Sequence, residues 1–209
     1  MNLFGRWLSV DPQRAAEGYT YGVELARRVS ETTGLKVATW MPLFGASSGG
    51  ITFSCRVDSL AAMGAASEKL AGDKGYQDLL AKNGGKLIGP MEDQISQFVS
   101  IAGEPNLAGN YASIISAQMG LGKLIEAMGW AVEVLDHVVA LTGVGGSLVQ
   151  GLFGPFGTVA WIGLYENLAQ LDEATAKQMA DTTYIEMVNH AGGLFVTGSV
   201  SSVLLQRVE

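Results

Sequence analysis

Two stretches of equal length decide the fold: TTGLKVATWMPLFG at residues 32–45 and LTGVGGSLVQGLFG at residues 141–154. Both carry a Thr-Gly pair near the start and end with Leu-Phe-Gly, and the matching residues lie 109 positions apart (142 − 33). Self-similarity at a fixed spacing is the sequence signature of a repeated structural unit. The chain of 209 residues therefore divides into two halves of about a hundred residues each.

The repeat continues on both sides of these stretches. At the same spacing, Tyr21 corresponds to Trp130. One residue fewer in the second copy of the turn at residues 45–50 changes the spacing to 108, and Asp73 then corresponds to Asp181 (181 − 73). A change of length in a surface turn costs little free energy. We therefore predict an old tandem duplication, with a first module at 1–103, a linker at 104–110 and a second module at 111–209.

Each half has the pattern of a β-α-β-β-α-β module. Asp11-Pro12 is typical of a helix start, and Gly34 of a helix end, because glycine adopts the left-handed terminal conformation without strain. Residues 51–57 alternate between apolar and polar side chains, as in a strand with one buried face. In the first half we predict strands at 4–10, 35–43, 51–57 and 94–101, a helix at 11–33, and a second helix from 59 that breaks near 72–75 and resumes at 76–82.

This element order predicts an α+β fold: two tandem ferredoxin-like βαββαβ modules that form an intramolecular dimeric α+β barrel. Two helices on one face of a four-stranded antiparallel sheet leave the other face bare. Burial of apolar surface favours a partner for that face. The second module is expected to supply the partner.

The stretch Leu70-Ala71-Gly72-Asp73-Lys74-Gly75-Tyr76-Gln77-Asp78-Leu79-Leu80, followed by Gly84-Gly85, resembles the second-helix region of NIPSNAP-like proteins. These belong to the dimeric α+β-barrel superfamily, here in a tandem fused form. The resemblance implies relatives such as small monooxygenases of antibiotic biosynthesis, muconolactone-isomerase-like enzymes and haem-binding chlorite-dismutase-like proteins. It also implies ligands between the sheet and its helices or inside the barrel.

Composition excludes several classes. A net charge of −7 without a basic stripe disfavours nucleic-acid binding. The single cysteine, Cys55, allows no intrachain disulfide and suits a cytoplasmic location. Residues 138–165 carry no charge, but frequent glycines disfavour a membrane-spanning helix there. We expect residues 151–165 to be buried, either between the sheets or against another subunit.

Departures from the repeat indicate candidate ligand-binding residues. Thr52, Ser54 and Arg56 correspond to Ala160, Ile162 and Leu164, so one strand face is polar only in the first half. Arg56 could bind a carboxylate or phenolate, and an ion pair with Asp58 or Glu92 is the alternative. Three tryptophans could line an aromatic pocket or belong to the core: Trp7, Trp40 and Trp161.

No catalytic residue and no metal site are predicted. His137 and His190 lie far apart, and neither is in a metal-ligand or haem-binding motif. No cofactor is predicted, with haem as the weaker alternative. The main hypothesis is a small-molecule-binding protein or a cofactor-independent enzyme acting on an apolar or aromatic compound. The alternative is a non-catalytic scaffold or interaction protein, a homo-oligomer assembling through residues 138–165; whether the chain is an enzyme stays open.

Overall fold

The computed structural model describes residues 1–46 and 49–208. The chain divides into two compact units: unit 1 is Met1–Ser96 with Gln206–Glu209, and unit 2 is Gln97–Leu205. Two strands, β4 (Leu87–Ala102) and β8 (Ser201–Val208), therefore contribute residues to both units. The predicted turn residues Ser47 and Ser48 lie outside the described residues.

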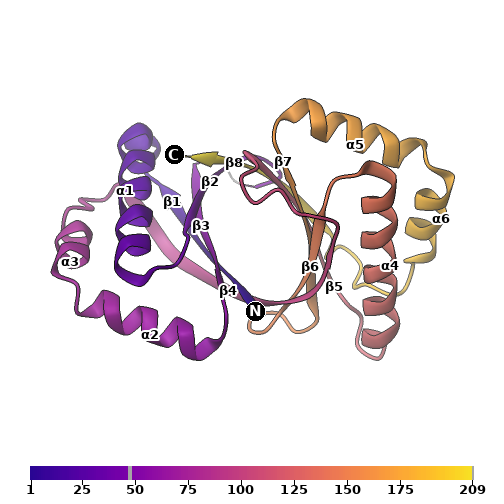
Figure 1. Ribbon diagram of the computed structural model, residues 1–209, viewed down its shortest axis with the longest axis horizontal. Helices are drawn as coiled ribbons and strands as arrows, with labels where there is room; N and C mark the ends of the chain where they lie inside the picture. The colour runs from indigo at the N-terminus through magenta and orange to yellow at the C-terminus, as the bar shows by residue number, and fades with distance from the viewer. Residues whose placement is uncertain (47–48, 209) are drawn as a thin grey trace. The chain divides into compact units, whose positions relative to one another are not determined.

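Unit 1 follows the predicted order of strand, helix, two strands, a helix in two pieces and a strand (Figure 1). Its elements before β4 are β1 (Asn2–Val10), the short 3-10 helix η1 (Pro12–Arg14), α1 (Ala15–Thr33), β2 (Ala38–Phe44), β3 (Gly50–Val57), α2 (Leu60–Ala71) and α3 (Lys74–Ala81).

Two predicted boundaries in unit 1 were wrong. The second strand starts at Ala38 and not at residue 35, because Leu35 N–H is bonded to the Thr33 hydroxyl and Val37 N–H to the Ser30 hydroxyl. The last strand starts at Leu87 and not at residue 94. Its first half is mostly exposed, so it lacks the apolar alternation that marks a half-buried strand.

Unit 2 repeats the same elements at the predicted spacing. Before β8 they are β5 (Tyr111–Gln118), α4 (Leu124–Thr142), β6 (Gly146–Gly151), β7 (Thr158–Tyr165), α5 (Leu168–Ala180) and α6 (Thr182–His190). Adding 109 to both ends of α1 gives the ends of α4, and adding 108 to both ends of β3 gives those of β7.

Strand register repeats as well. Antiparallel pairing of β1 with β3 runs from Asn2 opposite Val57 to Ser9 opposite Gly50. Pairing of β5 with β7 runs over the same positions after the shift, from Tyr111 opposite Tyr165 to Gln118 opposite Thr158. Register determines which side chains share a face of a sheet. Equivalent residues of the two units can therefore be compared one by one.

The helix ends have the same local causes in both units. Gly34 and Gly143 end α1 and α4 in the left-handed region, at φ 81° and 75°. The carboxylates of Asp73 and Asp181 accept hydrogen bonds from the backbone N–H groups of Tyr76 and Tyr184, which makes them N-caps of α3 and α6. These caps divide the second helix of each module into the two predicted pieces.

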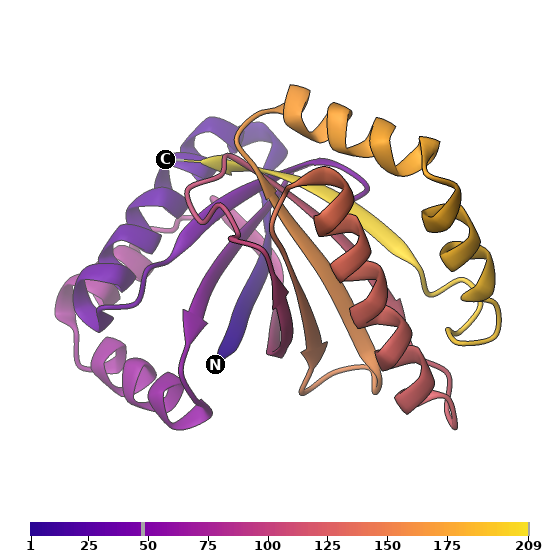
Figure 2. The ribbon, with the colours of Figure 1, turned by 45° about the vertical axis from the view of Figure 1, so that its right-hand side comes forward.

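The strands in the described part of the chain are hydrogen-bonded in the order β1-β3-β2-β8-β5-β7-β6-β4, which closes into a barrel. Within this order, β4-β1-β3-β2 and β8-β5-β7-β6 are the strand orders of two ferredoxin-like modules. In each unit the helices lie on one side of the unit's own strands (Figures 1 and 2). The predicted fold class is confirmed.

Each unit has its own core between the helices and the strands. In unit 1, the core residues come from β1, α1, β3 and the start of β4: Leu8, Val10, Tyr21, Ala26, Ile51, Phe53 and Leu87. In unit 2, they come from α4, β6, β7 and the segments that follow β5 and α6: Met119, Ala127, Ala131, Leu135, Leu148, Val159 and Leu194.

Within the chain itself, the expected burial of residues 151–165 is seen for only part of the segment. Val159 and Ala160 on β7 are buried, but the turn before β7 exposes Phe153 and Phe156, each with 66% of its surface accessible, and Leu152 with 40%. These residues form the tip of the β6–β7 hairpin, beyond the last paired residues. Among the described residues, no helix is both long enough and apolar enough to cross a membrane.

One glycine in unit 2 allows a close approach of two backbone segments. A Cβ atom added to Gly145 would lie 2.4 Å from the carbonyl carbon of Glu104 and 2.7 Å from the nitrogen of Pro105. Because the obstructing atoms are backbone atoms, they cannot rotate away. By contrast, a Cβ added to Gly129 on α4 would have no neighbour within 4 Å.

We therefore expect Gly145→Ala to lower the free energy of unfolding by about 1–3 kcal/mol through overpacking. The control Gly129→Ala should raise it by up to about 1 kcal/mol, since alanine favours a helix over glycine. Urea unfolding followed by circular dichroism measures both effects. Equal midpoints for the two variants would contradict the prediction.

Candidate functional site

The predicted polar residues of β3 lie on the side of the unit 1 sheet that faces away from α1. Ile51 and Phe53 point toward α1, since a Cβ added to Gly22 would meet both side chains. Successive side chains of a strand point to opposite faces. Thr52, Ser54 and Arg56 therefore lie on the face without helices.

Register adds two of the predicted tryptophans to this face. Trp7 on β1 and Trp40 on β2 both lie directly opposite Thr52 on β3. Residues directly opposite each other on neighbouring strands share a face. We call this set the tryptophan–arginine face: Trp7, Trp40, Thr52, Ser54 and Arg56.

Trp40 is held in place from two directions. Its indole Nε1 donates a hydrogen bond of 2.8 Å to the Ser54 hydroxyl. The guanidinium carbon of Arg207, on β8, lies 4.7 Å from the centre of its ring. Only 5% of the Trp40 surface is accessible. A cation over a tryptophan ring is attracted to it electrostatically, so Arg207 both fixes the indole and brings a positive charge to this face.

Sequence reasoning missed Arg207. This residue is the third from the C-terminal end of the chain and lies in a strand predicted only as the last element of the second module, yet the structure groups it with unit 1. A basic residue in a strand was the only available signal, and the strand pairing that brings it to Trp40 cannot be deduced from spacing.

Thr52 has an unusual hydroxyl group. Its Oγ1 atom is buried and has no hydrogen-bond partner in the structure. A buried polar atom without a partner typically costs about 1–3 kcal/mol. Such an atom calls for a specific explanation, of which a role in binding is one.

The third predicted tryptophan is not part of this face. Trp161 lies on β7 of unit 2, on the side that faces α4, where its Nε1 donates a hydrogen bond of 2.9 Å to the carbonyl oxygen of Ala131. Its ring meets those of Trp130 and Phe195 edge-on, with centroids 5.9 and 6.1 Å away. Its position in the repeat is that of Phe53, so alternation along the strand turns it toward the helix.

The equivalent face of unit 2 is mostly apolar. Thr52, Ser54 and Arg56 are matched there by Ala160, Ile162 and Leu164, and the strand registers make this match residue by residue. The positions of Trp7 and Trp40 are taken by Ser116 and Val149, which both lie opposite Ala160. Aromatic and cationic groups are therefore concentrated on one of two otherwise equivalent sheet faces.

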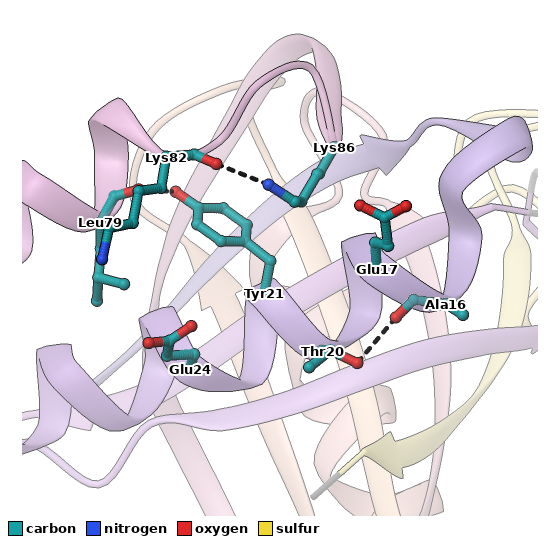
Figure 3. A pocket seen from close by; sticks show the side chains of 8 residues that line it. All are labelled: Ala16, Glu17, Thr20, Tyr21, Glu24, Leu79, Lys82 and Lys86. Carbon is teal, nitrogen blue, oxygen red and sulfur yellow. Dashed lines mark hydrogen bonds between the residues drawn. The ribbon is translucent and has the colours of Figure 1, made fainter.

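Two hollows open on helix surfaces elsewhere. In unit 1, a hollow of about 430 Å³ lies between α1 and the segment after α3, beside Tyr21 (Figure 3). Lys86 lies over the Tyr21 ring, and its ammonium group donates hydrogen bonds to the carbonyl oxygens of Lys82 and Asn83. This lysine therefore caps the end of α3, where the helix dipole favours a positive charge.

The second hollow, of about 380 Å³, lies in unit 2 beside α4. Its lining is almost entirely apolar: Met119, Leu124, Ile125, Met128, Gly129, Val132 and Gln150. Without a charged group to orient a ligand, it offers shape but little chemical selectivity. Neither hollow contains a predicted site residue.

The histidines have structural roles. His137 Nε2 is 2.8 Å from the carboxylate of Asp181, and in unit 1 the equivalent pair is Arg28 with Asp73 at 2.7 Å. His190 Nδ1 is 2.7 Å from the carbonyl oxygen of Glu186, one turn earlier on α6. In the described parts of the chain, no three His, Cys, Asp or Glu side chains gather in a way that could hold a metal ion.

The Cys55 side chain is buried, on the face of β3 that is turned toward the core of unit 1. Burial raises the pKa of its thiol, because the thiolate would lose its hydration. A buried thiol with a raised pKa is a poor nucleophile. The environment of Cys55 therefore indicates a structural role in the core and not a catalytic one.

Comparisons with known proteins address the fold. No family model matches the chain, and no curated protein matches its sequence. A protein of Fusobacterium nucleatum named as a candidate monooxygenase superimposes with a TM-score of 0.72 at 8% identity, over 100% of this chain and 92% of its own. An anthrone oxidase-like protein gives 0.69 at 13% identity, over 100% and 91%.

The chain has the dimeric α+β-barrel fold. A heme-degrading enzyme from Listeria monocytogenes shares it, with a TM-score of 0.54 at 6% identity over 99% of both chains. The predicted superfamily resemblance is confirmed at the level of the fold.

The cap of α3 generates a prediction about acid stability. Hydrogen bonds from the Thr32 hydroxyl, the Arg28 guanidinium and the Tyr76 N–H lower the pKa of Asp73 from 3.8 to about 2. A carboxyl group with a depressed pKa in the folded state stabilises the fold above its unfolded pKa and loses this contribution as the pH falls toward the folded value.

As the pH falls from 4 to 2, the free energy of unfolding should therefore decrease more steeply for the wild type than for Asp73→Asn. Urea midpoints measured in this range, relative to each protein's value at pH 6, test the difference. Asp181→Asn is the matched comparison, since the same cap in unit 2 has His137 in place of the arginine; the pKa of Asp181 is lowered as well, so an effect of the same sign is expected there. Parallel curves for wild type and Asp73→Asn would show that this carboxylate has no such role.

Proposed function

We propose that this protein binds a small apolar or aromatic compound on the tryptophan–arginine face of unit 1, as a binding protein or as a cofactor-independent enzyme. The observation that carries the proposal is the contrast between the two units. The same strands, in the same register, present aromatic and basic side chains in unit 1, and aliphatic side chains with a single serine, Ser116, in unit 2. Architecture alone does not require this difference, whereas binding at one face explains it.

The chemistry of the face suits an aromatic ring with an acidic oxygen. The indole of Trp7, which is only partly buried, offers flat apolar surface at a small cost in conformational entropy. Arg56 and Arg207 carry positive charge on a chain whose net charge is −7. A guanidinium group binds carboxylates through charge-assisted hydrogen bonds. An anionic ligand would therefore prefer this face to the rest of the surface.

Proteins with the same fold support the choice of compounds to test. One solved neighbour is described as anthrone oxidase-like, and another is named as a candidate monooxygenase. At 8–13% identity they share the fold with this chain and not a demonstrated activity. They favour aromatic compounds as the first probes.

Haem does not fit the residues of this chain well. Other neighbours are a chlorite dismutase and a heme-degrading enzyme. Here His137 uses Nε2 to contact Asp181, and His190 is exposed on α6. The space between α4 and its sheet is filled by Trp130, Trp161 and Phe195. A haem iron needs an axial ligand that faces a pocket, so we propose no step that involves haem.

We also infer that the two modules arose by duplication, with residues 1–103 and 111–209 as the copies and 104–110 as the connection. Matching helix ends and strand registers support this origin. A cytoplasmic location is part of the proposal, because a single buried thiol suits a reducing compartment.

Binding of 2-naphthoate, measured by calorimetry, tests the proposed site, with uncharged 2-naphthalenemethanol as the comparison ligand. We expect the wild type to prefer the carboxylate. Arg56→Gln should weaken 2-naphthoate roughly tenfold or more, because a hydrogen bond to a charged group contributes about 1.5–3 kcal/mol. The affinity for the alcohol should change little.

Thr52→Val provides a second variant with a different signature. Removal of a buried hydroxyl that has no partner should leave the stability unchanged or raise it by about 1 kcal/mol. If Thr52 contributes to the site, binding weakens while stability does not. An unchanged carboxylate preference in both variants would count against binding at this face.

The alternative function, assembly into a homo-oligomer, is favoured by the exposed tip of the β6–β7 hairpin. Phe153 and Phe156 lie close in sequence, and on the same unit Leu121 and Ile125 are 84% and 92% exposed. The hairpin tip adjoins the latter segment, because Met119 N–H donates to the carbonyl oxygen of Gly157. Large exposed apolar residues that gather in this way are typical of an interface.

If this surface joins two copies, light scattering after size-exclusion chromatography will give a dimer or larger species for the wild type. Phe153→Ser with Phe156→Ser should shift it to a monomer, since the association would lose buried apolar area. Phe44→Ser is the matched control, because Phe44 is the equivalent exposed residue of unit 1. A monomeric wild type at high concentration removes this alternative.

A further inference from the structure

Side chains on the tryptophan–arginine face form rows across the strands. The register gives one row with Trp7, Thr52 and Trp40, and the next with Gly5, Ser54 and Ala38. A third row pairs Leu3 with Arg56. The middle row thus consists of three small residues and is flanked by rows with larger ones.

The side chains of Trp7 and Trp40 are oriented differently relative to this middle row. Trp40 reaches into it, since its Nε1 is bonded to the Ser54 hydroxyl. Trp7 turns the other way: its ring atoms lie 2.4–3.2 Å from the position of a Cβ on Gly50, which belongs to the row beyond Thr52. The absence of a side chain at Gly50 gives the Trp7 indole a place away from Gly5.

Open space remains beside Gly5 as a result. A Cβ atom added to Gly5 would have no heavy atom within 4 Å apart from its chain neighbours. In unit 2, the equivalents of Gly5 and Ser54 are Ile114 and Ile162, which lie opposite each other. The same position is therefore filled by two branched aliphatic side chains in one unit and left open in the other.

A glycine inside a strand has a cost, because it has no side chain to pack and loses more conformational entropy on folding. The conformation of Gly5 does not require it, since Gly5 is absent from the glycines with positive φ. A close approach of other atoms does not require a glycine here either, because no heavy atom apart from those of its chain neighbours lies within 4 Å of the Cβ position. Space for a ligand is a physical reason for a glycine that these observations leave in place.

We infer that Gly5 determines the size of the ring that the site accepts, and that the ligand is a planar aromatic acid or phenol whose ring lies over Gly5. This inference rests on the proposed function. Rows on one face are roughly 7 Å apart along a strand and neighbouring strands roughly 5 Å apart, which matches one or two fused rings. Arg56, one row from Gly5, would bind the acidic oxygen, and Trp7 would border the ring.

Filling the open space tests the inference. Gly5→Ile introduces the residue that unit 2 has at this position, and Gly5→Ala adds a single methyl group. We expect Gly5→Ile to weaken 2-naphthoate binding roughly tenfold or more through steric overlap, and Gly5→Ala to weaken it less. The thermal midpoint should not fall, because a β-branched residue favours a strand over glycine.

Gly129→Ile is the matched control. It also replaces a glycine that has no neighbour within 4 Å of its Cβ position, and it lies in the apolar hollow of unit 2. Its binding of 2-naphthoate should equal that of the wild type. Loss of binding in this variant, with Gly5→Ile unaffected, would locate the ligand in unit 2 and reject both the inference and the proposed site.

The remaining outcomes distinguish failure of the proposed function from failure of the proposed role of Gly5. If the wild type binds 2-naphthoate, Arg56→Gln weakens it and Gly5→Ile does not, then the proposed function stands and the role of Gly5 is rejected. If the wild type binds neither 2-naphthoate nor the larger 9-anthracenecarboxylate, both are rejected. Gly5→Ala keeps the test decisive should Gly5→Ile fail to fold.

Discussion

Alternation of side chains along β3 is the constraint on which the rest of the structure depends. Ile51 and Phe53 are buried against α1, where Gly22 leaves room for them. Because a strand turns successive side chains to opposite faces, burial of these residues forces Thr52, Ser54 and Arg56 to the other face. A shift of register by one residue would bury the arginine and expose the core.

The two units show that nearly equivalent backbones can present different side-chain chemistry. Their helices end at equivalent residues, and their strands pair in the same register. Contacts that hold the helices are retained even where the residues differ. Tyr21 donates its hydroxyl to the carbonyl oxygen of Leu79, and Trp130 donates its indole N–H to that of Met187, both at 2.9 Å. The helix-free sheet faces lack this equivalence, which is why they are the informative places.

Conserved contacts and divergent faces lead to different conclusions. A contact that recurs in both units, such as Asp73 with Arg28 and Asp181 with His137, is explained by the helix that it caps. The aromatic and basic side chains of the tryptophan–arginine face have no equivalent in unit 2, so the shared fold does not account for them. A histidine in place of an arginine is therefore no sign of a site here, whereas a glycine in place of an isoleucine is informative.

The sequence alone determined the repeat, the element order and the broken second helix, because these depend on local signals: helix caps, terminal glycines and alternation within a strand. The same signals placed Thr52, Ser54 and Arg56 on a shared face. The start of β4 was not predicted, since its exposed first half has no apolar pattern.

Only the tertiary structure decided which residues from other strands join Thr52, Ser54 and Arg56 on the tryptophan–arginine face. Pairing with β1 and β2 brought Trp7, Trp40 and Gly5 to it, Arg207 arrived from the far end of the chain, and Trp161 turned toward α4. Pairing between distant strands follows from burial over the whole fold, and no short stretch of sequence carries that information.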